Sequence, residues 1–183
     1  MSSTLVLQCV TIILVLQRFS ELVLARRNER RARERGGIEI GRGHYPTIVL
    51  LHVCWFLAFN AEGLIRGSAA PAVGVFGLWW LWLSIFVCAQ LLRYWAIASL
   101  GDAWNTRIIV IPGNRRVARG PYALIPHPNY VAVIMEFIAV PLLVNAPITA
   151  CVGTVLNLAL LLTVRIPAER TAVELLAGGE QTP

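Results

Sequence analysis

Five runs of mostly apolar residues dominate the sequence, at residues 4–24, 47–65, 72–99, 129–144 and 148–164. A spanning helix needs about 20 such residues, because the hydrocarbon core of a bilayer is about 30 Å thick. Only 14% of the residues are charged, whereas soluble domains have about 25%. The sequence therefore predicts an all-α, polytopic membrane helix bundle with about five transmembrane helices.

The length of 183 residues favours one integral-membrane domain over residues 1–183. The opening residues carry no basic region and no small-residue cleavage site follows them, so we expect a retained helix rather than a signal peptide. No internal repeat is visible. The fourth and fifth runs are separated by three residues, Asn145 to Pro147, which predicts a tight helical hairpin.

The basic residues, all of them Arg, predict the orientation in the membrane. Seven lie in residues 26–42, which we expect to be a loop, four in 107–119 and two in 165–170, whereas the loop after the second run carries only Arg66. With five spans, the three Arg-rich segments share one side, and excess Arg marks the cytoplasm. We therefore predict an outside N-terminus and a cytoplasmic C-terminus, and we attribute the net charge of +6 to topology rather than to nucleic-acid binding.

The densest group of polar residues is RGPYALIPHPNY, at residues 119–130. Prolines on both sides of His127 disfavour helix there and place His127 at the start of the fourth run, with Tyr130 in the first turn. Just upstream, the β-branched residues 108–111 and a Pro-Gly-Asn turn predict extended chain that folds back. This segment of the sequence, taken by itself, is as typical of a rigid start of a helix as of a functional site.

Ionisable residues inside the apolar runs are a second group of candidates, because charge within a bilayer is costly. Glu136 lies in the middle of the fourth run and Arg93 near the end of the third. Glu136 is a candidate functional residue, and a purely structural pair with Arg93 is the alternative. After the fifth run, Glu169 follows Arg165 by four residues, which a solvated ion pair would also explain.

Several kinds of site have no support in the sequence. It contains no dinucleotide-binding glycine motif, Walker loop, HExxH or GxSxG motif. The four cysteines are far apart and form no CxxC pair, so we predict no metal site and expect the cysteines to pack as small buried apolar residues.

The sequence GPYALIPHPNY, followed by an apolar hairpin and then RIPAERTAVELL, resembles the isoprenylcysteine carboxyl methyltransferase family. The upstream stretches LLRYWAIASLGDAWNTRIIVIPG and RFSELVLARRNERR extend the resemblance over nearly the whole chain. Members are small integral-membrane enzymes that use S-adenosylmethionine. The resemblance thus implies an S-adenosylmethionine-dependent O-methyltransferase in a bacterial plasma membrane, with its active site on the cytoplasmic side.

Within the family, the chain most resembles the bacterial subgroup encoded beside type III polyketide synthases. That similarity implies a lipophilic acceptor, a phenolic lipid such as an alkylpyrone or an alkylresorcinol, and a functional link to such a synthase. Methylation of a prenylated cysteine carboxylate is the alternative reaction. Two departures from the family pattern, Pro126 in place of Arg and Arg170 in place of Glu, leave an inactive membrane scaffold as a third possibility.

The resemblance also assigns roles, mostly within residues 101–183. The candidate catalytic residues are Glu136, His127 and Arg165. The candidate cofactor-binding residues are Gly120, Pro121, Tyr122, His127, Pro128, Tyr130 and Glu169. An enzyme requires His127, Tyr130 and Glu169 to meet at one pocket. A scaffold predicts instead that residues 101–128 pack without a pocket.

Overall fold

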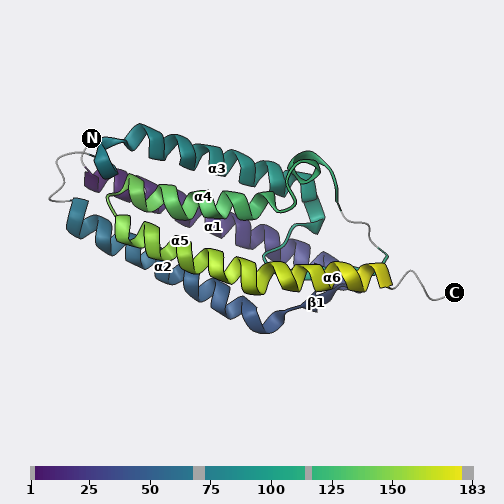
Figure 1. Cartoon of the computed structure of the whole chain (residues 1–183). Coiled ribbons are helices and arrows are strands. Elements are labelled where there is room, and N and C mark those ends of the chain that lie inside the picture. The colour runs from purple at the N-terminus through teal and green to yellow at the C-terminus, as the bar shows by residue number, and fades with distance from the viewer. Residues whose placement is uncertain (1–2, 68–72, 114–116, 179–183) are drawn as a thin grey trace.

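A computed structural model describes residues 3–67, 73–113 and 117–178. Five helices lie side by side in one elongated bundle, and a sixth extends beyond its far end (Figure 1). The α-helices are α1 (Ser3–Glu34), α2 (Tyr45–Gly67), α3 (Trp79–Leu100), α4 (Pro128–Leu143), α5 (Pro147–Leu160) and α6 (Ile166–Gly178). The strands are β1 (Ile38–Ile40) and β2 (Ile108–Val110). The short turns are η1 (Arg42–His44), η2 (Val75–Gly77), η3 (Gly101–Ala103), η4 (Gly120–Ala123) and the π-helical η5 (Leu161–Arg165).

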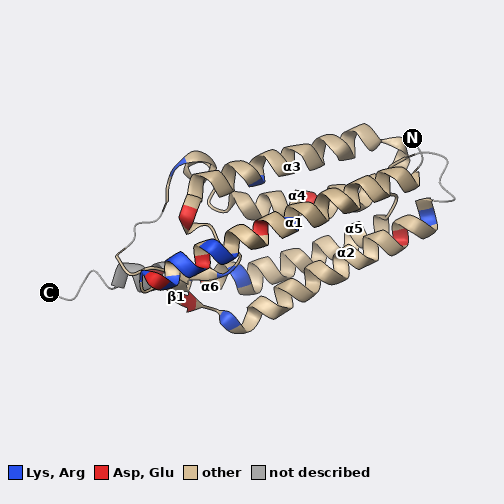
Figure 2. Cartoon of the chain, turned by 180° about the vertical axis from the view of Figure 1, so that it is seen from behind, with Lys and Arg blue, Asp and Glu red and all other residues tan. Residues whose placement is uncertain are grey.

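The predicted membrane helix bundle is confirmed. Among the described residues, four helical segments are long and apolar enough to cross a bilayer, namely Ser3–Glu34, Arg42–Gly67, Trp79–Ala103 and Pro147–Ala172. The fifth predicted span corresponds to α4, which is apolar but has only 16 residues. Charged residues gather at the end of the bundle that carries β1 and α6, and few lie along the helices between the two ends (Figure 2). The side of the membrane on which that end lies stays a prediction.

The short helix α4 lies between α3 and α5 (Figure 1) and is the most enclosed element of the bundle. Ala132, Phe137 and Val140 on α4 are fully buried, and the Phe137 ring stacks on Trp55 of α2 at 4.4 Å between centroids. The outer helices α1, α2 and α3 instead expose large apolar side chains, as helices in contact with lipid do. An enclosed helix need not meet the lipid at both surfaces, which explains how a 16-residue helix fits here.

The predicted hairpin and the predicted extended segment are both present. Helix α4 ends at Leu143 and α5 begins at Pro147, with Asn145 in the left-handed region at a φ of 63°. Strand β2 pairs antiparallel with β1, so that Ile108 faces Ile40. Asn114 of the predicted turn, together with Arg115 and Arg116, lies outside the described residues.

Two expectations about the ends of helices were wrong. The predicted loop after the first run is helical up to Glu34, because residues 25–34 are good helix formers with ion pairs at i, i+4, such as Glu29 with Arg33. The third predicted span starts later than expected, since the η2 turn precedes α3 and its Phe76 and Gly77 both have positive φ. Residue 72, where that span was expected to begin, lies outside the described residues.

The prediction that the cysteines pack inside the core was also wrong. All four are free and exposed on the outside of the bundle. A thiol is apolar enough to face lipid, so the hydropathy pattern could not distinguish a core position from a lipid-facing one.

A charged network ties α1, α3 and α4 together in the middle of the bundle. The fully buried carboxylate of Glu136 accepts hydrogen bonds from Arg93 at 2.5 Å and from Arg18 at 2.7 Å. Gln90 donates to the same carboxylate at 2.8 Å, and Glu21 pairs with both arginines. The pairing of Glu136 with Arg93, the structural alternative to a functional role of Glu136, is therefore present within a larger network.

Replacing Glu136 with Leu should destabilise the bundle strongly. The substitution leaves two arginines without their shared carboxylate in a dry interior, which is expected to lower the free energy of unfolding by about 3–5 kcal/mol. Thermal unfolding in detergent measures the effect. Glu34→Leu is the control, because Glu34 pairs with Arg30 at an exposed position and exposed pairs contribute about 1 kcal/mol or less. Equal unfolding temperatures for the two variants would contradict this account.

Glu39 should make stability depend on acidity at the polar end of the bundle. Burial alone would raise the pKa of its carboxyl, but hydrogen bonds from Arg107 and Arg33 lower it below the ordinary value of 4.5. A lowered pKa stabilises the fold above pH 4.5 and ceases to do so as the pH falls through the folded-state value. The unfolding temperatures of Glu39→Gln and the unmodified protein should therefore differ at neutral pH and converge below pH 4.5.

Candidate active site

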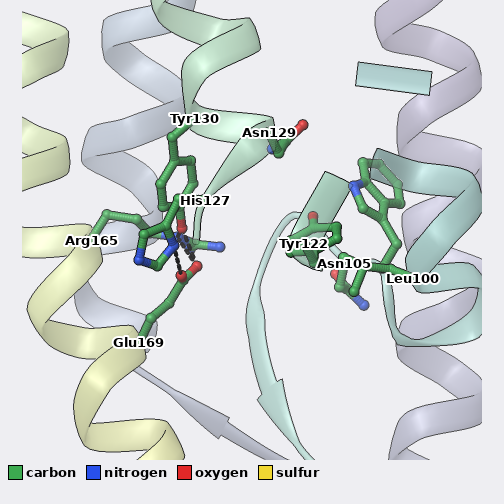
Figure 3. A pocket seen from close by; sticks show the side chains of 9 residues that line it. Leu100, Asn105, Tyr122, His127, Asn129, Tyr130, Arg165 and Glu169 are labelled. Carbon is green, nitrogen blue, oxygen red and sulfur yellow. Dashed lines mark hydrogen bonds and ion pairs between the residues drawn. The ribbon is translucent and has the colours of Figure 1, made fainter. Parts of the chain in front are cut away.

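A half-open cavity of about 130 Å³ lies at the polar end of the bundle, where α3, α4 and α6 meet the chain between α3 and α4 (Figure 3). Its wall combines residues from widely separated parts of the sequence. These are Leu100, Trp104, Asn105, Tyr122, His127, Asn129, Tyr130, Arg165 and Glu169. Segment 101–128 thus forms part of the wall of a pocket, contrary to what a scaffold predicts.

Four polar side chains meet on one wall of the cavity. Nδ1 of His127 lies 3.3 Å from Oε2 of Glu169, and the hydroxyl of Tyr130 donates a hydrogen bond to the other carboxylate oxygen. Nε of Arg165 donates to the Tyr130 hydroxyl at 2.9 Å and lies 3.4 Å from Glu169. Figure 3 shows these side chains converging from α4, η5 and α6. His127, Tyr130 and Glu169 therefore meet, as the enzyme interpretation requires.

Local sequence places His127 and Tyr130 together. His127 is the N-cap of α4 with non-helical dihedrals, and Pro128 fills the first helical position, where a missing N–H costs nothing. Three residues later Tyr130 lies on the same face of the helix, and the two rings stack at 5.3 Å with an interplanar angle of 15°. The helix thus fixes both side chains relative to one another.

The π-helical turn η5 brings the other two side chains of this wall, Arg165 and Glu169, to the cavity. Leu161 to Arg165 form a wider turn between α5 and α6, and such turns are frequent at functional sites. Arg165 ends this turn and is buried, and Glu169 follows one turn later in α6. The extra width changes the rotation of α6 about its axis, so it sets the direction from which Glu169 reaches the cavity.

The opposite wall is held in place by α1. The side-chain amide of the buried Asn28 donates to the carbonyl groups of Gly101 and Trp104, at 3.1 and 2.8 Å. Asn105 likewise donates to the carbonyl of Ala25 at 3.3 Å. The C-terminal part of α1, which we expected to be a loop, therefore supports Trp104 and Asn105 in the wall.

Two groups in the cavity have properties suited to a ligand. Oδ1 of Asn129 is buried and has no hydrogen-bond partner within the described part of the chain, so it can accept a hydrogen bond from a bound molecule. Burial, and secondarily the charge of Glu169, raise the pKa of Tyr122 to about 12. Tyr122 therefore stays neutral and offers an aromatic face and a hydroxyl donor.

The remaining predicted site residues do not line the cavity. Gly120 has a φ of 61°, and a Cβ there would collide with the side chain of Ser99, so only glycine fits. Pro121 and Pro128 are fully buried and shape the backbone around Tyr122 and His127. Glu136 lies nine residues beyond His127, about 13 Å along α4, and belongs to the charged network instead.

Four lining residues were not singled out from the sequence: Leu100, Trp104, Asn105 and Asn129. Asn129 directly follows the His127-Pro128 pair, so the same sequence motif could have indicated it. Trp104 and Asn105 lie within the upstream stretch that carried the resemblance, but nothing in their spacing indicated a site. No group of three His, Cys, Asp or Glu side chains suited to a metal occurs in residues 3–67, 73–113 and 117–178.

The cavity suits S-adenosylmethionine in its chemistry more than in its size. The unpartnered Asn129 Oδ1 and the Glu169 carboxylate can accept from an amino group or a ribose, Arg165 can meet a carboxylate, and the aromatic rings can meet a nucleoside. Its volume of about 130 Å³ is below the range of roughly 300–1,000 Å³ for small-molecule pockets. A ligand of this size therefore has to extend through the open mouth or rotate lining side chains.

Comparison with known proteins places the chain in a family. The uncharacterized protein YpbQ of Bacillus subtilis is 42% identical over 163 residues, which cover 88% of this chain and 93% of that protein. An uncharacterized protein of Haemophilus influenzae is 27% identical over 157 residues, 85% and 88% of the two chains. No solved structure matches. Residues 82–174, which include every residue lining the cavity, match the isoprenylcysteine carboxyl methyltransferase family, and the chain belongs to this family of integral-membrane methyltransferases.

Proposed function

We propose that the protein is an S-adenosylmethionine-dependent O-methyltransferase that acts on a hydroxylated lipophilic acceptor at the cytoplasmic face of a bacterial plasma membrane. The acceptor is a phenolic lipid such as an alkylpyrone or an alkylresorcinol. The observation that carries this proposal is the group of His127, Tyr130, Arg165 and Glu169 in a cavity at the end of an apolar bundle. A water-soluble cofactor and a lipid can both reach such a position.

The lining residues divide naturally among the parts of the cofactor. The Arg165 guanidinium would hold the carboxylate, and Glu169 with Asn129 Oδ1 would accept from the amino group or the ribose. Leu100 and Trp104 offer apolar surface for adenine. The faces of the neutral Tyr122 and Tyr130 rings suit a sulfonium, a cation–π contact of about 2 kcal/mol when dry.

When bound, the cofactor supplies a methyl group on a positively charged sulfur. The acceptor oxygen would take this methyl group in place of its hydroxyl proton, which a residue of the protein has to remove. Charge is neutralised in this transfer, so the protein contributes chiefly by aligning the reactants and excluding water. The buried cavity wall and the apolar end of the bundle serve both purposes.

His127 is the residue best placed to take the proton. Because Glu169 is a carboxylate and only accepts, Nδ1 of His127 carries the hydrogen shared with Glu169. Nε2 then keeps its lone pair, and no residue in the described chain hydrogen-bonds to it in the structure. Glu169 orients the ring and stabilises the cation that forms, while Tyr130 and Arg165 hold Glu169 in turn.

This arrangement favours a hydroxyl acceptor over a carboxylate. A phenol has a pKa of about 10 and retains its proton near neutral pH, so a positioned base helps its methylation. A prenylcysteine carboxylate has no proton to lose at that pH. The His127–Glu169 pair thus supports the phenolic lipid, which we propose is made by a type III polyketide synthase.

Replacing His127 with Ala should lower turnover about 10²- to 10⁴-fold, the usual contribution of a general base. The assay uses nanodisc-embedded protein, S-adenosylmethionine with a labelled methyl, and an alkylresorcinol, an alkylpyrone and a prenylcysteine as acceptors. We expect label in a phenolic lipid. Label only in the prenylcysteine would overturn the choice of acceptor. If none of the three acceptors is labelled and calorimetry detects no cofactor binding, the protein is not a methyltransferase and a scaffold is favoured.

Glu169→Gln should weaken cofactor binding and lower the maximal rate, because an amide lacks the negative charge that faces the His127 ring. The rate of methyl transfer in nanodiscs and the affinity for S-adenosylmethionine by calorimetry measure the two effects. Glu174→Gln is the matched control, since Glu174 lies on the same helix and is exposed. Equal rates and equal affinities in the two variants would show that Glu169 contributes neither to cofactor binding nor to the action of His127.

A further inference from the structure

A second cavity lies on the lipid-facing side of the bundle, between α1 and α3. We call it the α1–α3 groove, and it is lined by Ile13, Leu16, Gln17, Ser20, Gln90 and Tyr94. Its volume of about 350 Å³ exceeds the 130 Å³ of the active-site cavity and falls within the range of roughly 300–1,000 Å³ for small-molecule sites. The groove is therefore large enough for a lipid headgroup.

The floor of the groove is polar, although the groove lies within two membrane-spanning segments. Oε1 of Gln90 is buried and has no hydrogen-bond partner among the described residues. The half-exposed Tyr94 lies one turn further along α3 and brings a hydroxyl to the lining of the groove. Ser20 donates its hydrogen to the carbonyl of Gln17 and keeps its oxygen lone pairs. These groups can both accept and donate hydrogen bonds.

Such groups need a partner that the bilayer itself does not provide. Hydrocarbon contains no water, and an unsatisfied polar group there costs several kcal/mol. Gln90 and Tyr94 are four residues apart, hence neighbours on one face of α3. One bound hydroxyl can therefore donate to Gln90 Oε1 and accept from the Tyr94 hydroxyl.

The charged side chains next to the α1–α3 groove indicate what kind of lipid headgroup it can bind. Arg18 and Arg93 are balanced by Glu21 and Glu136, through four ion pairs of 2.5–3.4 Å. The groove thus has no uncompensated charge nearby to stabilise an ionic headgroup. A phosphate or carboxylate would be buried without a counter-ion, which is unfavourable.

We propose that the α1–α3 groove binds a lipid with an uncharged, hydroxyl-bearing headgroup, whose chain lies along the exposed apolar side chains of α1 and α3. Leu16 and Leu91 are among those side chains. The groove is separate from the active site, because Glu136, beneath the groove, is six residues or about 9 Å along α4 from Tyr130. A lipid bound there is held, rather than methylated.

The groove also distinguishes substrate from product. This one inference rests on the methyl transfer proposed above. The unmethylated lipid can donate its hydroxyl hydrogen to Gln90, whereas the methyl ether has no hydrogen to donate. The groove would then retain the acceptor and release the product.

The test uses full-length protein in nanodiscs and 5-pentadecylresorcinol carrying a photoreactive group in its chain, with crosslinked peptides identified by mass spectrometry. Crosslinks are expected in α1 and α3. Tyr94→Phe removes one hydroxyl and should raise the half-saturating concentration about five- to tenfold. Leu16→Trp should fill the groove and raise it more than tenfold. Leu50→Trp is the matched control, because Leu50 is exposed to a similar extent on α2 (62%, against 63% for Leu16) and should change nothing.

Competition with unlabelled lipids tests the choice of headgroup. The dimethyl ether of the probe should compete at least tenfold more weakly, and phosphatidylglycerol and palmitate should not compete. Equal competition by the ether, stronger competition by an anionic lipid, or equal effects of Leu16→Trp and Leu50→Trp would overturn the proposal. His127→Ala separates the two proposals, since it should abolish methyl transfer and leave crosslinking in the groove unchanged.

Discussion

The buried carboxylate of Glu136 on α4 ties α1, α3 and α4 together. Between helices in lipid there is little hydrophobic driving force, because acyl chains are as apolar as leucine. Specific polar contacts therefore carry much of the information about which helices meet and in which register. Here Arg18 from α1 and Arg93 from α3 both reach one carboxylate on α4, with glutamines of the same two helices beside them. This fixes α4 along the bundle axis, and so fixes the height at which His127 and Tyr130 emerge at its end.

The active-site cavity depends on that placement, but it is completed by parts of the chain that leave the bundle. Asn28 on the extension of α1 holds the segment that carries Trp104, while the π-helical turn before α6 aims Arg165 and Glu169 from the opposite side. Each wall is thus anchored to a different membrane helix. The geometry of the site is a property of the whole bundle rather than of one loop.

The sequence predicted the features that depend on composition and local stiffness. Apolar runs predicted the spans, three residues between runs predicted the hairpin, and prolines around His127 predicted the start of α4. The family resemblance added that His127, Tyr130 and Glu169 meet. The role of Glu136 was left open between catalysis and structure, and the four-way network around it depends on distances across helices that no local pattern encodes. The helical extension of α1 was missed because its many arginines suggest a solvated loop, whereas charged residues in i, i+4 pairs also favour helix.

The length of α1 links the active site to the membrane itself. Its 32 residues form one helix of about 48 Å, which exceeds the roughly 30 Å of the hydrocarbon core. The part of α1 that extends beyond the hydrocarbon core carries Asn28. The helix therefore connects the lipid rigidly to the wall of the cavity. Helices adjust to thinner or thicker bilayers by tilting, and a tilt of α1 displaces its far end the most. The thickness of the host membrane is therefore expected to alter the shape of the cavity, so that the lipid composition of the membrane would influence what the cavity can bind.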